Sequence, residues 1–262
     1  MESIPCDQES NTPEGISLAD FTRSVMMSIY QEKNPDASET DISNAHDEIE
    51  KFIFDVKQWF EKTMRPINAT TKLAEKQYAI SSKLVEQLAD EVVLSDNLDI
   101  TLGESEEIRK YIDTAIDELH KNVHIKPYDT LFLQAITAYK SELYDLAVLG
   151  FFAIIDGLLS DITNDHGSVK IKQRTEKAVN IDSLHTPKDH AAINTALQKL
   201  SLLMVSELLS ESKPFSGAEP ETLNRHWAMH GRTRTKKTKA DCEKLILFIY
   251  SLVSTVEDTN KE

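Results

Sequence analysis

The stretch Asp41–Thr63, DISNAHDEIEKFIFDVKQWFEKT, decides the fold class. Its apolar residues recur at steps of three and four, which places them on one side of a helix. Asp41 is the expected N-cap, because its carboxylate can accept a first-turn N–H. We expect Pro66 to end this helix or to start the connection that follows it. The apolar stripe consists of Ile42, Ala45, Ile49, Phe52, Ile53, Val56, Trp59 and Phe60.

The same period recurs along the rest of the chain and predicts an all-α protein. The segment 142–162 is apolar almost all round, which is typical of a helix at the centre of a bundle. No segment alternates as a strand would, and no repeat of 20–50 residues is visible. A helical bundle is therefore the expected architecture. Further helices are expected over residues 69–94, 104–123, 130–141, 142–162, 187–211, 221–230 and 241–256.

A polar break at Ser95–Gly103 suggests a domain boundary. It divides the chain into a loose leader (1–15), an N-terminal helical region (16–103) and a C-terminal helical domain (104–262). Within the C-terminal domain, the segment Lys213–Pro220 holds Pro, Gly and Ser, so it predicts a loop before the last helices.

The sequence predicts a cytoplasmic protein without membrane contact. The first ten residues, MESIPCDQES, have neither the basic nor the apolar region of a signal peptide. The longest apolar runs, Leu146–Ile155 and Leu245–Leu252, are shorter than the roughly 20 residues that span a bilayer. Two cysteines at opposite ends of the chain indicate free thiols.

Composition excludes several classes of protein. The 262 residues include only 7 glycines and 2 cysteines, which excludes a collagen-like chain and a disulfide scaffold. Hydrophobic residues make up 40%, enough to build a core. Against 29 Lys and Arg stand 44 Asp and Glu, a net charge of −15, which argues against a general binder of polyanions.

The stretch Leu223–Gly231, LNRHWAMHG, gathers side chains that could act together. Arg225 and His230 are five positions apart, about 140° around a helix and about 7.5 Å along it. His226 and His230 share one face, and Asn224 precedes them. Arginine stabilises charge on a transferring phosphoryl group, and histidine moves protons near neutral pH. The alternative is a set of surface residues that close a helix end.

This set suits the cleavage of RNA, because the 2′-OH of RNA supplies the nucleophile. Neither a metal nor another cofactor is then required. The spacings His226-x3-His230 and His120-x3-His124 are compatible with zinc. However, no His-Glu-x-x-His motif or cysteine cluster completes such a site, so no metal is predicted.

A basic run, RTRTKKTK, follows directly at residues 232–239. It has five basic residues and no acidic one, in a chain that is acidic overall. Such residues could hold a nucleic-acid backbone through phosphate contacts. The alternative is a solvated loop. The basic residues are Arg232, Arg234, Lys236, Lys237 and Lys239.

One acid, Asp156, interrupts the apolar helix predicted over 142–162. An unpaired buried carboxylate is costly, so it needs a partner. Arg225 or a histidine of the 223–231 stretch is the expected one. Alternatively, Asp156 reaches solvent near the helix end or caps another backbone.

These residues together resemble the HEPN superfamily, and in particular a bacterial branch of it. The resemblance rests on the Arg225-x4-His230 motif, the polar loop and apolar helix that follow, and the segment Tyr144–Asp161 with its acid. It covers roughly residues 104–258 and does not extend to residues 1–100.

The resemblance implies a metal-independent endoribonuclease, often a toxin or an anti-phage effector, that acts as a homodimer with its two motifs facing each other. Arg225 would stabilise the phosphate and His230 would be the acid or base, while Asp156 matches the acidic position. His226 stands where Asn is commoner, and Asn224 belongs to the same constellation. RNA would be the substrate, and an antitoxin or other regulatory protein would be a further partner. The alternative is a non-catalytic HEPN-like module for nucleotide or nucleic-acid binding or for dimerisation.

Overall fold

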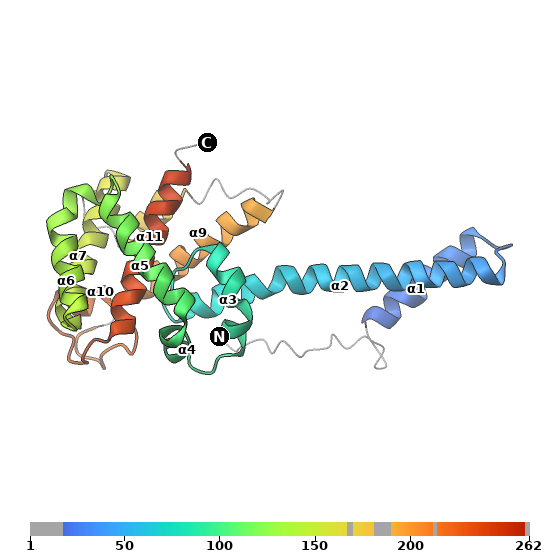
Figure 1. Ribbon diagram of the computed structural model, residues 1–262, viewed down its shortest axis with the longest axis horizontal. Helices are drawn as coiled ribbons and strands as arrows, with labels where there is room; N and C mark the ends of the chain where they lie inside the picture. The colour runs from blue at the N-terminus through green and yellow to red at the C-terminus, as the bar shows by residue number, and fades with distance from the viewer. Residues whose placement is uncertain (1–17, 167–169, 181–189, 212–213, 260–262) are drawn as a thin grey trace. The chain divides into compact units, whose positions relative to one another are not determined.

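The computed structural model describes residues 18–166, 170–180, 190–211 and 214–259, and every regular element in them is a helix (Figure 1). The all-α prediction is confirmed. The chain divides into two compact units, residues 1–64 and 65–262. The expected leader over 1–15 lies outside the described residues. The division falls earlier than the expected boundary at Ser95–Gly103, which lies inside the second unit.

The first unit contains α1 (Leu18–Lys33) and the beginning of α2 (Glu39–Glu75). Arg23 on α1 pairs with the Glu50 carboxylate on α2, with 3.1 Å between Nη2 and Oε2. The prediction of Asp41 as the N-cap is wrong by one turn. Ser38 is the capping residue: its Oγ accepts from the Asp41 N–H, and the Asp41 carboxylate accepts from the Ser38 N–H.

The prediction that Pro66 ends the first long helix is also wrong. Pro66 lies inside α2, which continues to Glu75. Proline removes one helical hydrogen bond, at a cost of about 3 kcal/mol. The turns that follow bury Ala69 and Leu73 in the core of the second unit, and this burial offsets that cost.

The helix expected over 69–94 is interrupted. After α2 ends, Gln77 adopts a left-handed conformation with φ of 65°, and α3 (Ser82–Leu94) begins five residues later. The Gln77 side chain is buried and forms two hydrogen bonds of 2.7 Å with the backbone of Leu223. The pairing of Gln77 with Leu223 accounts for the break between α2 and α3. No local sequence pattern predicts it, because the two residues are far apart in the chain.

The second unit continues through α4 (Leu98–Glu104), α5 (Glu106–Lys121), η1 (Lys126–Tyr128), α6 (Asp129–Lys140), α7 (Tyr144–Thr163), α8 (Ile171–Ala178), α9 (His190–Ser210), α10 (Arg225–Met229) and α11 (Lys239–Thr259). The helices expected over 104–123, 130–141, 142–162, 187–211 and 241–256 are therefore confirmed within a few residues. One hydrophobic core runs from Ala69 to Val256 and includes Leu98 and Ile108 on the two sides of Gly103.

Helix α7 packs against α6, α8, α10 and α11, and Figure 1 shows α6 and α7 next to each other. Two glycines permit the close approach. A Cβ on Gly150 would lie 2.8 Å from the Ala135 Cβ, and one on Gly157 would overlap the ring of Tyr128. Leu146 and Leu149 are exposed, so α7 is not buried on every side. Of the helices described, α7 also has the length and hydropathy of a membrane span, a test that core helices of soluble proteins pass as well.

Candidate active site

Hydrogen bonds and burial hold the motif stretch, residues 223–231, in place. Gln77 holds the backbone of Leu223. Asn224 caps α10: its Oδ1 accepts from the Trp227 N–H at 3.1 Å, while its Nδ2 donates to the Glu211 carbonyl at 2.7 Å. Trp227 is buried. Both polar atoms of Asn224 are thus engaged with the backbone, which gives this residue a positioning role within the expected constellation.

Helix α10 is shorter than the expected 221–230, because the chain enters it only after Asn224. It spans five residues, Arg225–Met229. Gly231 follows with φ of 62°, a conformation that suits glycine after a helix end. The short stretch of backbone between Asn224 and Gly231 therefore carries Arg225, His226 and His230 into one small volume.

Arg225 is bonded to Asp156 on α7. Its Nε donates to Asp156 Oδ2 at 2.8 Å, and its Nη2 donates to the same oxygen. The Arg225 side chain is 34% exposed, and no described residue accepts a hydrogen bond from its Nη1. Of the alternatives open for Asp156, the structure selects a partner in the motif.

Asp156 has a second cationic partner, Arg174 on α8, which the sequence reasoning missed. Arg174 Nη2 lies 3.3 Å from Asp156 Oδ1, and its Nη1 donates to the Asp156 carbonyl at 3.0 Å and to Ser160 Oγ at 2.7 Å. Helix α8 itself was missed, because its sequence IKQRTEKA holds too few apolar residues for a stripe. The only sequence feature that pointed to Arg174 was Asp156 itself, an acid in an apolar helix. That feature predicted one cationic partner but not a second.

The two histidines of the motif lie beside each other and against Phe215. The ring centroids of His226 and His230 are 4.6 Å apart. Phe215 stacks on His226 at 4.5 Å with the planes 6° apart, and meets His230 edge-on at 5.5 Å. Phe215 belongs to the segment expected as a loop, and its role could not be foreseen without the fold.

The environment favours the neutral form of His226. Burial lowers the pKa of its imidazole, and the nearby positive charges of His230 and Arg225 lower this pKa further. A histidine that is neutral at physiological pH can accept a proton. The exposed ring of His230 lies beside it. The pair therefore places one ring suited to accept a proton next to a second imidazole that solvent can reach.

The basic run divides into paired and unpaired residues. Lys239, the first residue of α11, lies 3.2 Å from the Glu243 carboxylate, and Lys237 Nζ lies 3.8 Å from that of Glu219. Arg232 places its guanidinium over Phe215 at 5.3 Å. Arg234 and Lys236 are exposed and form no ion pair with any residue that the structure describes. These two, together with Arg232 over the Phe215 ring, are the cations of the run that no described carboxylate pairs with.

Glu219 organises the backbone of the run. Its Oε2 accepts from the N–H groups of Arg234 at 2.8 Å and Thr235 at 3.1 Å. Burial alone would raise the pKa of the Glu219 carboxyl, but these two donors and the charge of Lys237 hold it below its usual range. The loop is therefore built around an ionised carboxylate rather than left loose in solvent.

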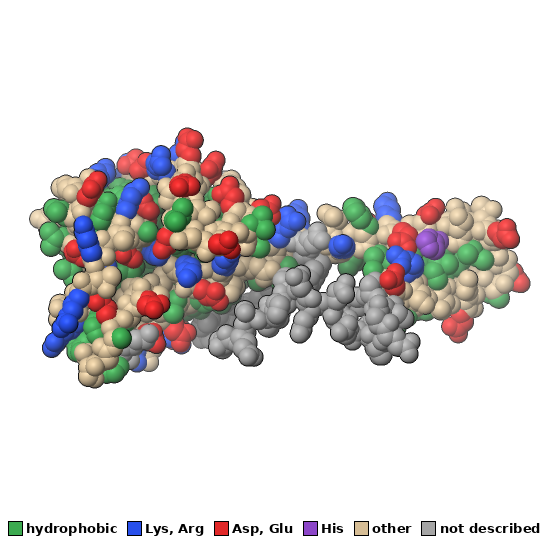
Figure 2. Space-filling view, turned by 90° about the horizontal axis from the view of Figure 1, so that it is seen from below, with side chains coloured by type: hydrophobic (Ala, Val, Ile, Leu, Met, Phe, Trp, Pro, Cys, Tyr) green, Lys and Arg blue, Asp and Glu red, His purple; other side chains and the backbone are tan. Residues whose placement is uncertain are grey.

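Charged side chains of both signs are interspersed on the face shown in Figure 2. The acidity of the chain is thus spread over this face rather than gathered in one patch. Local charge at the motif is set by near neighbours, which is why a net charge of −15 is compatible with a cationic cluster around Arg225.

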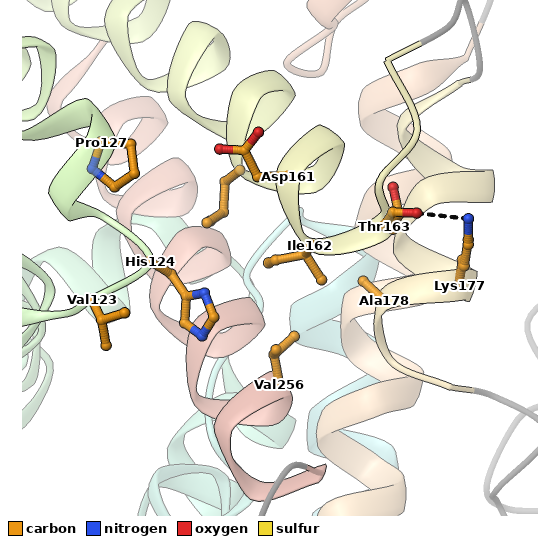
Figure 3. Close-up of a pocket in the computed structure, with 10 residues that line it drawn as sticks. Val123, His124, Pro127, Asp161, Ile162, Thr163, Lys177, Ala178 and Val256 are labelled. Carbon is orange, nitrogen blue, oxygen red and sulfur yellow. Dashed lines mark hydrogen bonds between the residues drawn. The ribbon is translucent and has the colours of Figure 1, made fainter.

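A pocket of about 480 Å³ lies at the end of α7 (Figure 3). His124 points into it, and Lys177 at its rim donates to the Thr163 carbonyl at 2.7 Å. None of the motif side chains lines it. Its lining consists of Val123, His124, Pro127, Leu158, Asp161, Ile162, Thr163, Lys177, Ala178 and Val256.

The described residues contain no group of three His, Cys, Asp or Glu side chains that could hold a metal ion. His120 is engaged with Asp129, with 3.1 Å between Nδ1 and Oδ1, rather than with His124. Cys242 is a buried free thiol, whose pKa burial raises to about 12, whereas Cys6 lies outside the described residues.

No protein-family model matches the chain, and searches among curated proteins and solved structures give no match either.

Proposed function

We propose that this chain is a metal-independent endoribonuclease of the HEPN type. The observation that carries the proposal is the Arg225 guanidinium, anchored to Asp156 through one edge and open at Nη1, on the same short helix as His226. An arginine fixed in this way offers preorganised donors to a phosphate. Its charge acts on the His226 ring, whose centroid lies 4.6 Å from that of His230.

In the proposed reaction, the 2′-oxygen of a ribose attacks the adjacent phosphorus. His226 takes the 2′-OH proton, because its lowered pKa keeps the ring neutral. The bond from phosphorus to the 5′-oxygen breaks, and protonated His230 gives its proton to that oxygen. Arg225 stabilises the negative charge that develops on the phosphoryl oxygens. The products are a 2′,3′-cyclic phosphate and a 5′-OH end.

We propose that two copies of the chain assemble over this site. Leu146, Leu149 and Asp156 lie at steps that place them on one side of α7. The two leucines are 60% and 39% exposed, an unusual cost for a helix that is otherwise core. A second copy that covers them would bring its own Arg225 and His230 to the first, as the resemblance implies.

The free cations of the basic run would guide the RNA backbone. Arg234 and Lys236 are exposed and close in sequence to His230. Lys237 and Lys239 are compensated by Glu219 and Glu243, so they contribute less to phosphate binding. The biological role proposed is RNA restriction, as a cytoplasmic toxin or anti-phage effector held in check by an antitoxin or another regulatory protein.

The test is incubation of the purified chain with RNA in EDTA. Wild type should cleave, and the ends should be 2′,3′-cyclic phosphate and 5′-OH. Arg225→Ala, His226→Ala and His230→Ala should lose activity by at least about 100-fold. His120→Ala is the matched control, because its partner is Asp129 and not the motif.

Equal cleavage by wild type and all three variants, or loss of wild-type activity in EDTA, would overturn the mechanism. RNA binding without cleavage would instead support the alternative of a binding module. Growth inhibition on overexpression that disappears in His230→Ala would support the role as a toxin.

A further inference from the structure

Asp156 lies between two guanidinium groups, and each takes a different oxygen of its carboxylate. Arg225 bonds to Oδ2 at 2.8 Å from Nε, whereas Arg174 Nη2 lies 3.3 Å from Oδ1. The Asp156 side chain is 19% exposed and that of Arg174 only 8%. Arg174 belongs to a different helix from the motif and takes no part in the proposed reaction.

We propose that Arg174 is a positioning residue for the Arg225 site. It occupies Oδ1, so that Asp156 offers only Oδ2 to Arg225 and the outer edge of the Arg225 guanidinium stays free for a phosphate. The identity of the anion as an RNA phosphodiester rests on the proposed function, but the positioning itself does not.

The contacts of Arg174 fix the carboxylate in one orientation. Its Nη1 donates to the Asp156 carbonyl at 3.0 Å and to Ser160 Oγ at 2.7 Å, one turn further along α7. The guanidinium is planar, so these bonds also fix the direction of Nη2 toward Oδ1. Asp156 therefore cannot rotate to present both oxygens to Arg225 while Arg174 is in place.

A carboxylate with both oxygens free would pair with Arg225 as a two-pronged fork. That geometry is the preferred one for an isolated arginine and carboxylate. It would tie the Arg225 guanidinium more closely to Asp156, whose charge would then weaken the attraction of the arginine for an incoming phosphate. Arg174 removes this competing arrangement.

The charge balance of the cluster also favours an anion. Arg174 and Arg225 carry two positive charges against the single negative charge of Asp156, so the cluster keeps one surplus positive charge. A phosphodiester carries one negative charge. Low exposure strengthens the attraction, since water screens a partly buried charge poorly. Without Arg174 the cluster would be neutral.

A purely structural role would give different results. Arg174 also joins α8 to α7, so its loss will lower stability in either case. A residue that only linked the two helices would not alter the affinity of the site for an anion or the titration of His226. These two quantities therefore distinguish a positioning role from a purely structural one, and both can be measured without RNA cleavage.

The experiment follows the imidazole C–H signals of His226 and His230 by NMR during titration with inorganic phosphate and with pH. Arg174→Gln should bind phosphate about 10-fold more weakly, since it loses a charge-assisted contribution of about 1.4 kcal/mol. The pKa of His226 should rise, because Asp156 then neutralises Arg225 more fully. Lys172→Gln, on the same helix and paired with exposed Glu207, is the control and should change neither quantity.

Arg174→Lys keeps the charge but loses the fork, and it carries the test if Arg174→Gln does not fold. In this variant kcat on RNA should fall by about 10-fold to 100-fold, with a smaller change in KM. In an Asp156→Asn background, Arg174→Lys should lower kcat no further, because it acts through that carboxylate.

Wild-type phosphate affinity and an unchanged His226 titration in folded Arg174→Gln, or a wild-type kcat in folded Arg174→Lys, would overturn the proposal. So would additive effects of the two substitutions. If the wild-type chain cleaves no RNA while these NMR effects are present, the ribonuclease proposal fails and the positioning role of Arg174 stands.

Discussion

Arg225 and Asp156 lie 69 positions apart in the chain, yet two donors of the Arg225 guanidinium share one oxygen of the Asp156 carboxylate. The bond joins α10 to α7. It makes the motif dependent on the core, because the orientation of Arg225 follows from the position of one residue on a helix that is largely packed into that core.

Substitution of Asp156 should therefore lower the free energy of unfolding more than substitution of Arg225. Asp156→Asn leaves the buried guanidinium of Arg174 without its counter-charge, whereas Arg225→Gln leaves the pair of Arg174 and Asp156 intact. We expect Asp156→Asn to lower the free energy of unfolding by about 2 kcal/mol more than Arg225→Gln. Urea denaturation checks this, and equal losses would show that the Arg174 contact contributes little.

Gln77 provides a second link between the core and the motif. Gln77→Leu should leave both the N–H and the carbonyl of Leu223 buried without a partner, because each is bonded to this side chain at 2.7 Å. We expect a loss of about 2–3 kcal/mol in unfolding free energy. Gln77→Glu should lose at least as much, because it buries a carboxylate whose oxygen faces the Leu223 carbonyl, one acceptor against another. If both variants are as stable as wild type, the pairing does not hold the stretch in place.

The periodic parts of the sequence predicted the helices well, and the departures have distant causes. The apolar stripes placed α5, α6, α7, α9 and α11 within a few residues. The break after α2 was missed because Gln77 is held by Leu223, far along the chain. Pro66 was expected to end a helix, but α2 continues past it, because the turns that follow bury Ala69 and Leu73 in the core.

The site was predicted only as far as neighbouring residues could reveal it. Arg225, His226 and His230 are close in sequence; the structure places the two histidine rings 4.6 Å apart and bonds Arg225 to Asp156. The Asp156 partner followed from the cost of burying a charge. Arg174 lies on a short polar helix and Phe215 in a loop, where neither period nor motif exists. Their roles depend on packing between distant segments.

His226 should make stability depend on pH. Burial, followed by the charges of His230 and Arg225, lowers its pKa in the folded state below the ordinary 6.5. The unfolded chain then binds more protons between the two pKa values, so this contribution to stability is complete above about pH 6.5 and is lost as pH falls. His226→Gln should flatten that dependence. A pH series of urea denaturations measures it, and an unchanged slope would contradict the shift.

Phe215 should be the main source of that burial, because it stacks on His226 at 4.5 Å. Phe215→Ala should expose the imidazole and raise the His226 pKa toward its ordinary value. The acid limb of the pH–rate profile for RNA cleavage should move to higher pH with it. Phe132→Leu, in the core and away from the motif, controls for general loosening of the fold. A His226 pKa that stays low in Phe215→Ala would assign the shift to charge alone.

The basic run allows a direct test of which cations contact RNA. Arg234 and Lys236 are exposed and unpaired among the described residues, whereas Lys239 lies 3.2 Å from the Glu243 carboxylate. Each phosphate contact with single-stranded RNA contributes about 0.7 to the slope of log affinity against log salt. Substituting both Arg234 and Lys236 by Gln should therefore weaken binding and flatten the slope by about 1.4. Lys239→Gln should change it less, because the charge is already compensated. Binding isotherms at several salt concentrations measure these slopes. Equal slopes for all variants would show that the run is a solvated loop that does not contact the RNA backbone.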